Sequence, residues 1–167
     1  MNNIFLMGYM ASGKTTLGKE LAQHLNKKFI DLDKYIELAE GKTISQLFTE
    51  IGEDAFREME HNYLMEVSEN NDNIIALGGG TPCFFNNLEI INASGTSYYL
   101  KVPAYIIQQR IENDSNKRPL LDGMDEFEML EYIQQHMGDR ELYYLRADKI
   151  FSGKNKSDLF NFVSSNT

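Results

Sequence analysis

The stretch GYMASGKT, residues 8–15, is the part of the sequence whose residue types and spacing point most directly to chemistry. Gly8, four further residues, and then Gly13, Lys14 and Thr15 match the P-loop pattern in full, between an apolar run and a stretch of helical period. Glycines permit positive φ, so backbone N–H groups can converge on phosphate oxygens at a helix N-terminus. Lys14 can then reach the terminal phosphates, and Thr15 can offer its hydroxyl to Mg²⁺. A glycine-rich turn that only caps a helix is the alternative; the context favours nucleotide binding.

Two carboxylates follow the next apolar run, in the stretch FIDLD of residues 29–33. Residues i and i+2 of a strand project to the same side, so we expect Asp31 and Asp33 to face one way at the end of the second strand. That end of an open α/β sheet is where ligands bind. One carboxylate can join a Mg²⁺ shell and the other can accept a hydroxyl proton. The alternative is a polar strand end, with Asp33 capping a helix that starts at Lys34.

Three glycines, residues 78–80, follow the third apolar run and would leave bare backbone N–H groups at the same edge. A flexible turn before Pro82 is the alternative. Arg57 and Glu60 share a helical face in FREME, and a surface ion pair is the commonest explanation of such spacing.

Two further arginines lie in the second half of the chain. Arg118 follows Lys117 in a polar loop, where a basic residue can fold over transferring phosphates, or can simply be a solvated charge. Arg140 lies in a predicted helix, where local pattern gives it no role. The three histidines share no metal-ligand spacing, and we expect them to face solvent.

The composition bounds the class of protein. A chain of 167 residues with 42% apolar residues predicts one domain with a substantial core, over residues 1–167. A net charge of −9 argues against a nucleic-acid or membrane partner. The single cysteine, Cys83, excludes an intramolecular disulfide and fits a reducing cytosol. We therefore expect a soluble, cytoplasmic protein.

Short apolar runs rich in β-forming residues alternate with longer stretches of helical period. The expected strands are residues 3–7, 29–32, 73–77, 97–102 and 149–151; the expected helices are residues 14–25, 34–68 (with breaks near Gly41 and Gly52), 104–111, 126–144 and 158–164. This alternation predicts an α/β fold with a parallel sheet and helices on both faces.

The stretches GYMASGKTT, FIDLD, FREME, ALGGGTP, RPLL and GDRELYYLRAD together resemble the shikimate kinase family in order and spacing, over nearly the whole chain. The P-loop is shared with many unrelated NTPases, whereas the combination of DLD, FRxxE and GGG is much more specific. The resemblance implies ATP-dependent phosphorylation of the 3-hydroxyl of shikimate, on the route to aromatic amino acids. It also implies a relative of nucleoside monophosphate kinases: a single-domain P-loop kinase with five parallel strands in the order 2-3-1-4-5, a mobile lid at about residues 113–123 and a substrate-binding region at about residues 33–61.

The resemblance further implies a role for each matching residue. The residues that would bind the ATP phosphates are Ala11, Ser12, Gly13, Lys14, Thr15 and Thr16. Lys14 would bridge the β- and γ-phosphates, Thr15 and Asp31 would belong to the Mg²⁺ shell, and Asp33 would hold the reacting hydroxyl as candidate base.

For the substrate, the resemblance implies that Arg57 and Arg140 grip the carboxylate, beside the glycines Gly79 and Gly80. Arg118 would be the lid arginine over the phosphates, and Arg110 would lie against the adenine. The stretch at residues 152–156, SGKNK, departs from the Arg and Pro that the family often carries near the adenine, so no contact is assigned there.

The function expected is therefore transfer of the γ-phosphoryl group of ATP to shikimate with Mg²⁺, by an enzyme expected to be a monomer. A gluconate or nucleotide kinase is a second reading, but gluconate kinases lack the DLD, FRxxE and GGG set, and nucleotide kinases need a base-binding region. A non-catalytic nucleotide-binding switch is a third, and it would need neither a carboxylate-gripping site nor a basic lid.

Overall fold

The computed structural model describes residues 3–114, 123–153 and 155–166, and a five-stranded parallel sheet lies at its centre. The strands are β1 (Asn3–Met7), β2 (Lys28–Asp31), β3 (Asn73–Ala76), β4 (Gly95–Leu100) and β5 (Lys149–Phe151). They lie in the order β2-β3-β1-β4-β5, and each neighbouring pair is parallel. The parallel sheet and its strand order are confirmed.

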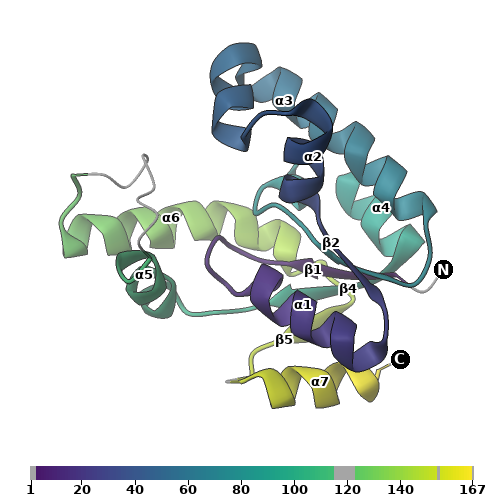
Figure 1. Cartoon of the computed structure of the whole chain (residues 1–167). Helices are drawn as coiled ribbons and strands as arrows, with labels where there is room; N and C mark the ends of the chain where they lie inside the picture. Colours follow the sequence, from purple (N-terminus) through teal and green to yellow (C-terminus); the bar gives the residue numbers. More distant parts are fainter. Residues whose placement is uncertain (1–2, 115–122, 154, 167) are drawn as a thin grey trace.

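Helices cover both faces of this sheet, as predicted (Figure 1). They are α1 (Lys14–Leu25), α2 (Leu32–Glu40), α3 (Ile44–Glu69), α4 (Asn87–Ser94), α5 (Ala104–Glu112), α6 (Glu126–Tyr144) and α7 (Lys156–Ser164), with a 3₁₀ turn η1 at Thr81–Cys83. The bounds expected for α1, α6, β1 and β5 agree with the structure, whereas α4 and η1 were not predicted. In the described part of the chain, no helix is long and apolar enough to span a bilayer.

Each face of the sheet has its own core, because successive strand residues point to opposite sides. In β1, Phe5 and Met7 face the core built with helices α2 to α6, and Ile4 and Leu6 face the core built with α1 and α7. β1 is buried along its whole length. The P-loop that follows it therefore starts from a fixed position.

Glycines set the two breaks predicted in the region between β2 and β3. Gly41 ends α2 with φ of 66°, and Gly52 interrupts α3 with φ of 77°. Both values lie in the left-handed region that glycine adopts without a Cβ clash. Thr43 and Gln46 then form a reciprocal capping box that starts α3.

The carboxyl ends of β1, β2 and β3 lie at one edge of the sheet, because these three strands are parallel neighbours. β1 runs into the P-loop, β2 ends at Asp31, and β3 runs into the three glycines. The sheet therefore brings together stretches far apart in the sequence at the edge where open α/β sheets bind ligands.

Candidate active site

The backbone of the P-loop binds the amino group of Lys14. Nζ of Lys14 donates 2.8 Å hydrogen bonds to the carbonyl oxygens of Gly8 and Tyr9. Gly8 and Gly13 have φ of 149° and 100°, and a Cβ atom added at Gly8 would lie 2.9 Å from the carbonyl oxygen of Leu100. The loop therefore requires glycine at both ends of the motif.

A pocket of about 630 Å³ opens beside this loop. Residues 11–17 line it, together with Arg110, Asn113, Gly153 and Asn155. Nη1 of Arg110 donates a 2.9 Å hydrogen bond to the carbonyl oxygen of Ala11. The pocket joins the start of helix α1 to the stretch after β5, for which sequence reasoning assigned no contact, and it is large enough for a small ligand.

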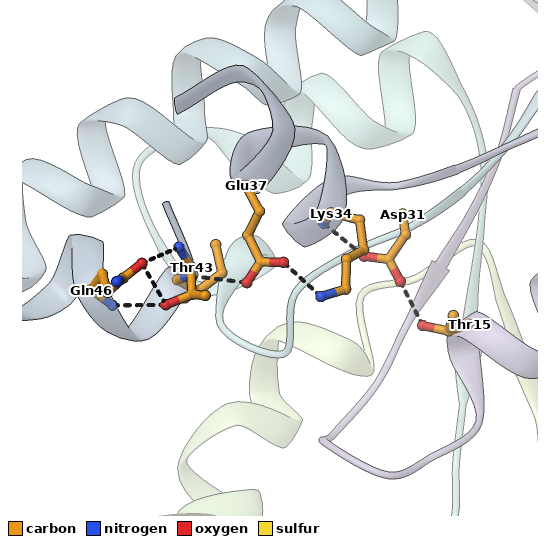
Figure 2. A network of polar contacts seen from close by, with 7 residues as sticks. Thr15, Asp31, Lys34, Glu37, Thr43 and Gln46 are labelled. Carbon is orange, nitrogen blue, oxygen red and sulfur yellow. Dashed lines mark hydrogen bonds and ion pairs between the residues drawn. The ribbon is translucent and has the colours of Figure 1, made fainter. Parts of the chain in front are cut away.

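Thr15 and Asp31 are in direct contact at the edge of this pocket. The Thr15 hydroxyl donates a 2.6 Å hydrogen bond to Oδ2 of Asp31, while Oδ1 of Asp31 accepts from the backbone amide of Lys34 and caps α2 (Figure 2). Hydroxyl and carboxylate oxygens are ligands that suit Mg²⁺, which usually takes only one or two protein carboxylates beside phosphates and water. Within residues 3–114, 123–153 and 155–166, no cluster of three or more His, Cys, Asp or Glu forms a metal site by itself.

The structure corrects the expectation for Asp33. Strand β2 ends at Asp31, and α2 already begins at Leu32, so the two aspartates are not strand neighbours on one face. The cap that was considered for Asp33 belongs to Asp31. Asp33 lies instead in the first turn of α2, so its carboxylate is positioned by the helix.

The carboxylate of Asp33 lies against the glycine turn. A Cβ atom added at Gly78 would be 2.9 Å from Oδ1 of Asp33 and 3.1 Å from Oε1 of Glu60. Burial, and then the negative charges of Glu60 and Asp31, raise the pKa of Asp33 to about 6, while the nearby Lys14 opposes this rise. A carboxylate tuned toward neutral pH beside the P-loop lysine has the properties of a general base.

Arg57 and Glu60 form a buried pair, so the alternative explanation of their spacing, a surface ion pair, does not apply. Arg57 is 7% exposed and Glu60 is 1% exposed. Nη1 of Arg57 donates a 2.9 Å hydrogen bond to Glu60 Oε2, and the Thr81 hydroxyl donates a 2.7 Å bond to Glu60 Oε1. Nη2 of Arg57 reaches Glu53 at 3.2 Å.

Three aromatic rings surround the guanidinium of Arg57. Its Cζ lies 4.3 Å from the ring centroid of Phe84, 5.4 Å from that of Phe56 and 5.5 Å from that of Phe48. Nε of Arg57 is buried and has no hydrogen-bond partner in the described part of the chain. The rings and the bond to Glu60 hold this planar cation in one orientation beside Gly80.

The glycine turn places Arg140 close to Arg57 and to the P-loop. A Cβ atom added at Gly79 would lie 3.2 Å from Nη1 of Arg140, and one added at Gly80 would lie 2.7 Å from Nη2 of Arg57. The Tyr144 hydroxyl donates a 2.6 Å hydrogen bond to the Gly79 carbonyl oxygen. A side chain at residue 80 would push the Arg57 guanidinium away, and one at residue 79 would crowd that of Arg140.

Two groups of residues at this edge had no sequence signal. Phe48 and Phe84 contact Arg57 from distant positions, and His136, expected to face solvent, is half-buried with Nδ1 2.9 Å from the Tyr9 hydroxyl. Of the residues expected in the site, Arg118 lies outside the described residues.

The parallel sheet, the complete P-loop with its pocket, and the second set of charged residues beyond it define a P-loop kinase of a small molecule. A family model for shikimate kinase matches residues 10–164. A shikimate kinase from Parabacteroides distasonis is 47% identical over 154 residues, covering 92% of this chain and 89% of the relative. One from Bacteroides thetaiotaomicron is 43% identical over 165 residues, covering 99% and 94%. The chain belongs to the shikimate kinase family.

Solved structures agree with this assignment. The crystal structure of the Bacteroides thetaiotaomicron shikimate kinase matches with a TM-score of 0.91 at 40% identity, covering 99% of this chain and 96% of that one. The shikimate kinase from Acinetobacter baumannii in complex with shikimate matches with a TM-score of 0.86 at 30% identity, covering 100% and 95%. A gluconokinase from Sinorhizobium meliloti shares the fold alone, with a TM-score of 0.54 at 13% identity.

Proposed function

We propose that the chain transfers the γ-phosphoryl group of ATP to the 3-hydroxyl of shikimate, forming shikimate 3-phosphate for chorismate and aromatic amino acid biosynthesis. One observation supports the substrate most strongly: two arginines, Arg57 and Arg140, lie against one glycine turn beside the P-loop. In a protein of net charge −9, such a local concentration of positive charge suits a small carboxylate. Arginine suits this task because its planar fork can give two parallel bonds to one carboxylate.

ATP would occupy the pocket beside the P-loop. Its phosphates would meet the backbone of Ala11, Ser12 and Gly13 and the side chains of Lys14, Thr15 and Thr16. Arg110, which bonds to the Ala11 carbonyl and lines the same pocket, would lie against the adenine. We propose that Thr15 and Asp31 hold Mg²⁺, which would neutralise charge on the phosphate oxygens when bound. On nucleotide binding, Lys14 would exchange its bonds to Gly8 and Tyr9 for phosphate oxygens.

Asp33 would accept the proton of the substrate hydroxyl. Its pKa of about 6 leaves it mostly ionised at neutral pH while making it a better proton acceptor than an ordinary aspartate. Lys14, close enough to affect that pKa, would face the same reacting group from the phosphate side. Arg118 is proposed, on the resemblance alone, to fold over the transferring phosphates.

The substrate carboxylate would bind between Arg57 and Arg140, with Gly79 and Gly80 at its base. The carboxylate would accept from the guanidinium of Arg57 on the side that faces Gly80. Glu60 would keep the Arg57 guanidinium in place through its 2.9 Å bond to Nη1. All residues assigned to both ligands come from one chain, so we propose that the enzyme acts as a monomer; the use of ATP and the single cysteine fit the cytoplasm.

An ATP-consumption assay with shikimate, gluconate and AMP side by side tests the proposal. We expect turnover with shikimate and little with the other two acceptors. In Lys14→Met, which keeps the stem but removes the charge, kcat should fall about a hundredfold or more. Equal turnover with gluconate or AMP would overturn the substrate assignment, and a variant that keeps more than about a tenth of wild-type kcat would overturn the role of Lys14.

A further inference from the structure

One face of α6 contacts both proposed ligand sites. His136, Arg140 and Tyr144 are spaced four residues apart, so they lie along the same side of the helix. His136 Nδ1 is 2.9 Å from the hydroxyl of Tyr9 in the P-loop, and Tyr144 donates to the carbonyl of Gly79 at 2.6 Å. Arg140 is therefore flanked, one turn to either side, by bonds to the nucleotide loop and to the substrate turn.

The hydrogen bond between Tyr9 and His136 depends on the conformation of the P-loop. Tyr9 is 1% exposed, and its ring meets the His136 ring edge-on, with centroids 5.5 Å apart. Its carbonyl oxygen accepts bonds from Nζ of Lys14 and, at 3.3 Å, from the amide of Ser12. A change in these bonds when phosphates bind would move the backbone that carries the Tyr9 side chain. In Figure 1 the loop between β1 and α1 meets the edge of α6, in agreement with this contact.

The surroundings of His136 favour the neutral imidazole. Burial, and then the nearby positive charge of Arg140, lower the pKa of His136, so the ring is neutral at neutral pH. A neutral ring can accept from, or donate to, the Tyr9 hydroxyl at Nδ1. The neutral ring adds no second positive charge beside Arg140, so the Arg140 guanidinium can bind an anionic ligand without repulsion from His136.

We propose that Tyr9 and His136 are positioning residues that fix Arg140 relative to the P-loop, and that through them nucleotide binding strengthens shikimate binding. The inference rests on the proposed role of Arg140 in the shikimate site. Such coupling must be reciprocal, because each ligand changes the affinity of the other by the same factor.

Calorimetric titration of shikimate, without nucleotide and with saturating Mg²⁺ and a non-hydrolysable ATP analogue, measures this coupling. In the wild type, the analogue should tighten shikimate binding. In Tyr9→Phe, which removes only the hydroxyl, that gain should shrink by about two- to tenfold, the range expected for one hydrogen bond. His136→Leu should do the same, while His136→Asn, which keeps a polar atom near Nδ1, should restore most of the gain.

Tyr99→Phe is the matched control. Tyr99 is also 1% exposed, its hydroxyl donates to Glu141 on α6 at 3.4 Å, and its ring packs on that of Tyr144 with centroids 5.1 Å apart, so it contacts α6 at Glu141 and Tyr144. We expect it to leave the coupling unchanged even if it lowers the melting temperature.

Arg140→Ala separates this inference from the function on which it rests. If Arg140→Ala leaves shikimate affinity unchanged, the role of Arg140 and the inference both fail. If Arg140→Ala weakens shikimate binding but Tyr9→Phe keeps wild-type coupling, or if the wild type shows no coupling, only the inference fails. An equal loss of coupling in Tyr99→Phe would also overturn it, because the effect would then be general loosening of α6.

Discussion

Arg57 donates a 2.9 Å hydrogen bond to Glu60 one turn further along α3, and both side chains are buried beside the glycine turn. Burying two charges costs desolvation energy that an ion pair alone often fails to offset. We infer that the pair serves the proposed carboxylate site, because Glu60 orients the guanidinium of Arg57. Its positive charge is thus held ready beside Gly80.

The methyl ester of shikimate tests the proposed binding of the substrate carboxylate by Arg57 and Arg140 in the unmodified enzyme. The ester keeps the ring hydroxyls but lacks the negative charge, so it should be a poor substrate. Hydrogen bonds to charged groups contribute about 1.5–3 kcal/mol each, so Arg57→Ala should raise KM for shikimate about ten- to a hundredfold. KM for ATP should change much less, and the ester should be less sensitive than the acid to Arg57→Ala. Similar kcat/KM for ester and acid in the wild type would contradict the carboxylate-binding role proposed for Arg57 and Arg140.

A magnesium titration tests the contact between Thr15 and Asp31. Both residues are assigned to the metal shell, so Asp31→Asn and Thr15→Val should each raise the Mg²⁺ concentration needed for half-maximal activity. Asp33→Asn is the control: it should lower kcat strongly with little change in that concentration. The assignment is wrong if the two asparagine variants respond alike to Mg²⁺.

The pH dependence of activity tests Asp33 as the base. Because its carboxylate must be ionised to accept a proton, kcat/KM for shikimate should fall below a pH near 6. The negative charge of Glu60 is the second cause of the raised pKa, after burial. Glu60→Gln should therefore move the acidic limb to lower pH, even though it also weakens shikimate binding. A limb that does not move in Glu60→Gln would argue against Asp33 as its origin.

The same raised pKa makes a prediction for stability. The folded state holds the Asp33 proton more tightly than the unfolded state, whose pKa is near 3.8, so the protonated group favours folding below pH 4 and this contribution is lost as pH rises through 6. Asp33→Asn, which is never charged, should therefore be more stable than wild type at pH 7.5, by up to about 3 kcal/mol, and should lose this advantage near pH 4. Urea unfolding at both pH values measures the difference. Asp31→Asn should show no such gain, because Thr15 and the Lys34 amide already stabilise the Asp31 charge.

Local chemistry explains which parts of this molecule could be predicted from sequence. The P-loop is fixed by glycines and a lysine within eight residues, and the breaks at Gly41 and Gly52 need only backbone freedom. The strand order came only with the family resemblance, since the pairing of β1 with both β3 and β4 is not a local property. Helix α4 was missed because its eight residues are too few to show a clear period.

Two of the errors at the site share one physical cause, which is that burial and contact depend on other parts of the chain. The spacing of Arg57 and Glu60 predicts a helical pair but cannot reveal that Phe48 and Phe84 enclose it. Tyr9 and His136 are 127 residues apart, and nothing near either residue indicates their bond. The start of α2 was placed late because the side chain of Asp31, rather than that of Asp33, caps it.

We expect backbone strain at Ala11 in the P-loop. Ala11 has φ of 56°, in the left-handed region where a Cβ atom meets the backbone. An ordinary residue there loses about 1–2 kcal/mol, while glycine loses roughly 0.5–1 kcal/mol through its greater freedom when unfolded. Ala11→Gly should therefore stabilise the folded protein by up to about 1 kcal/mol, which raises the melting temperature by about 2–4 °C.

Gly41→Ala is the opposite substitution at a matching backbone position. Gly41 has φ of 66°, and an added Cβ atom there would meet no other atom within 4 Å, so only the backbone conformation is tested. We expect Gly41→Ala to destabilise by about 1 kcal/mol, because the clash of a Cβ atom in the left-handed region exceeds its entropic gain in the unfolded chain. Thermal unfolding of both variants under the same conditions measures the two effects. If Ala11→Gly lowers the melting temperature while Gly41→Ala behaves as expected, the alanine is held by contacts that outweigh its backbone strain, and the P-loop is not a site of stored strain.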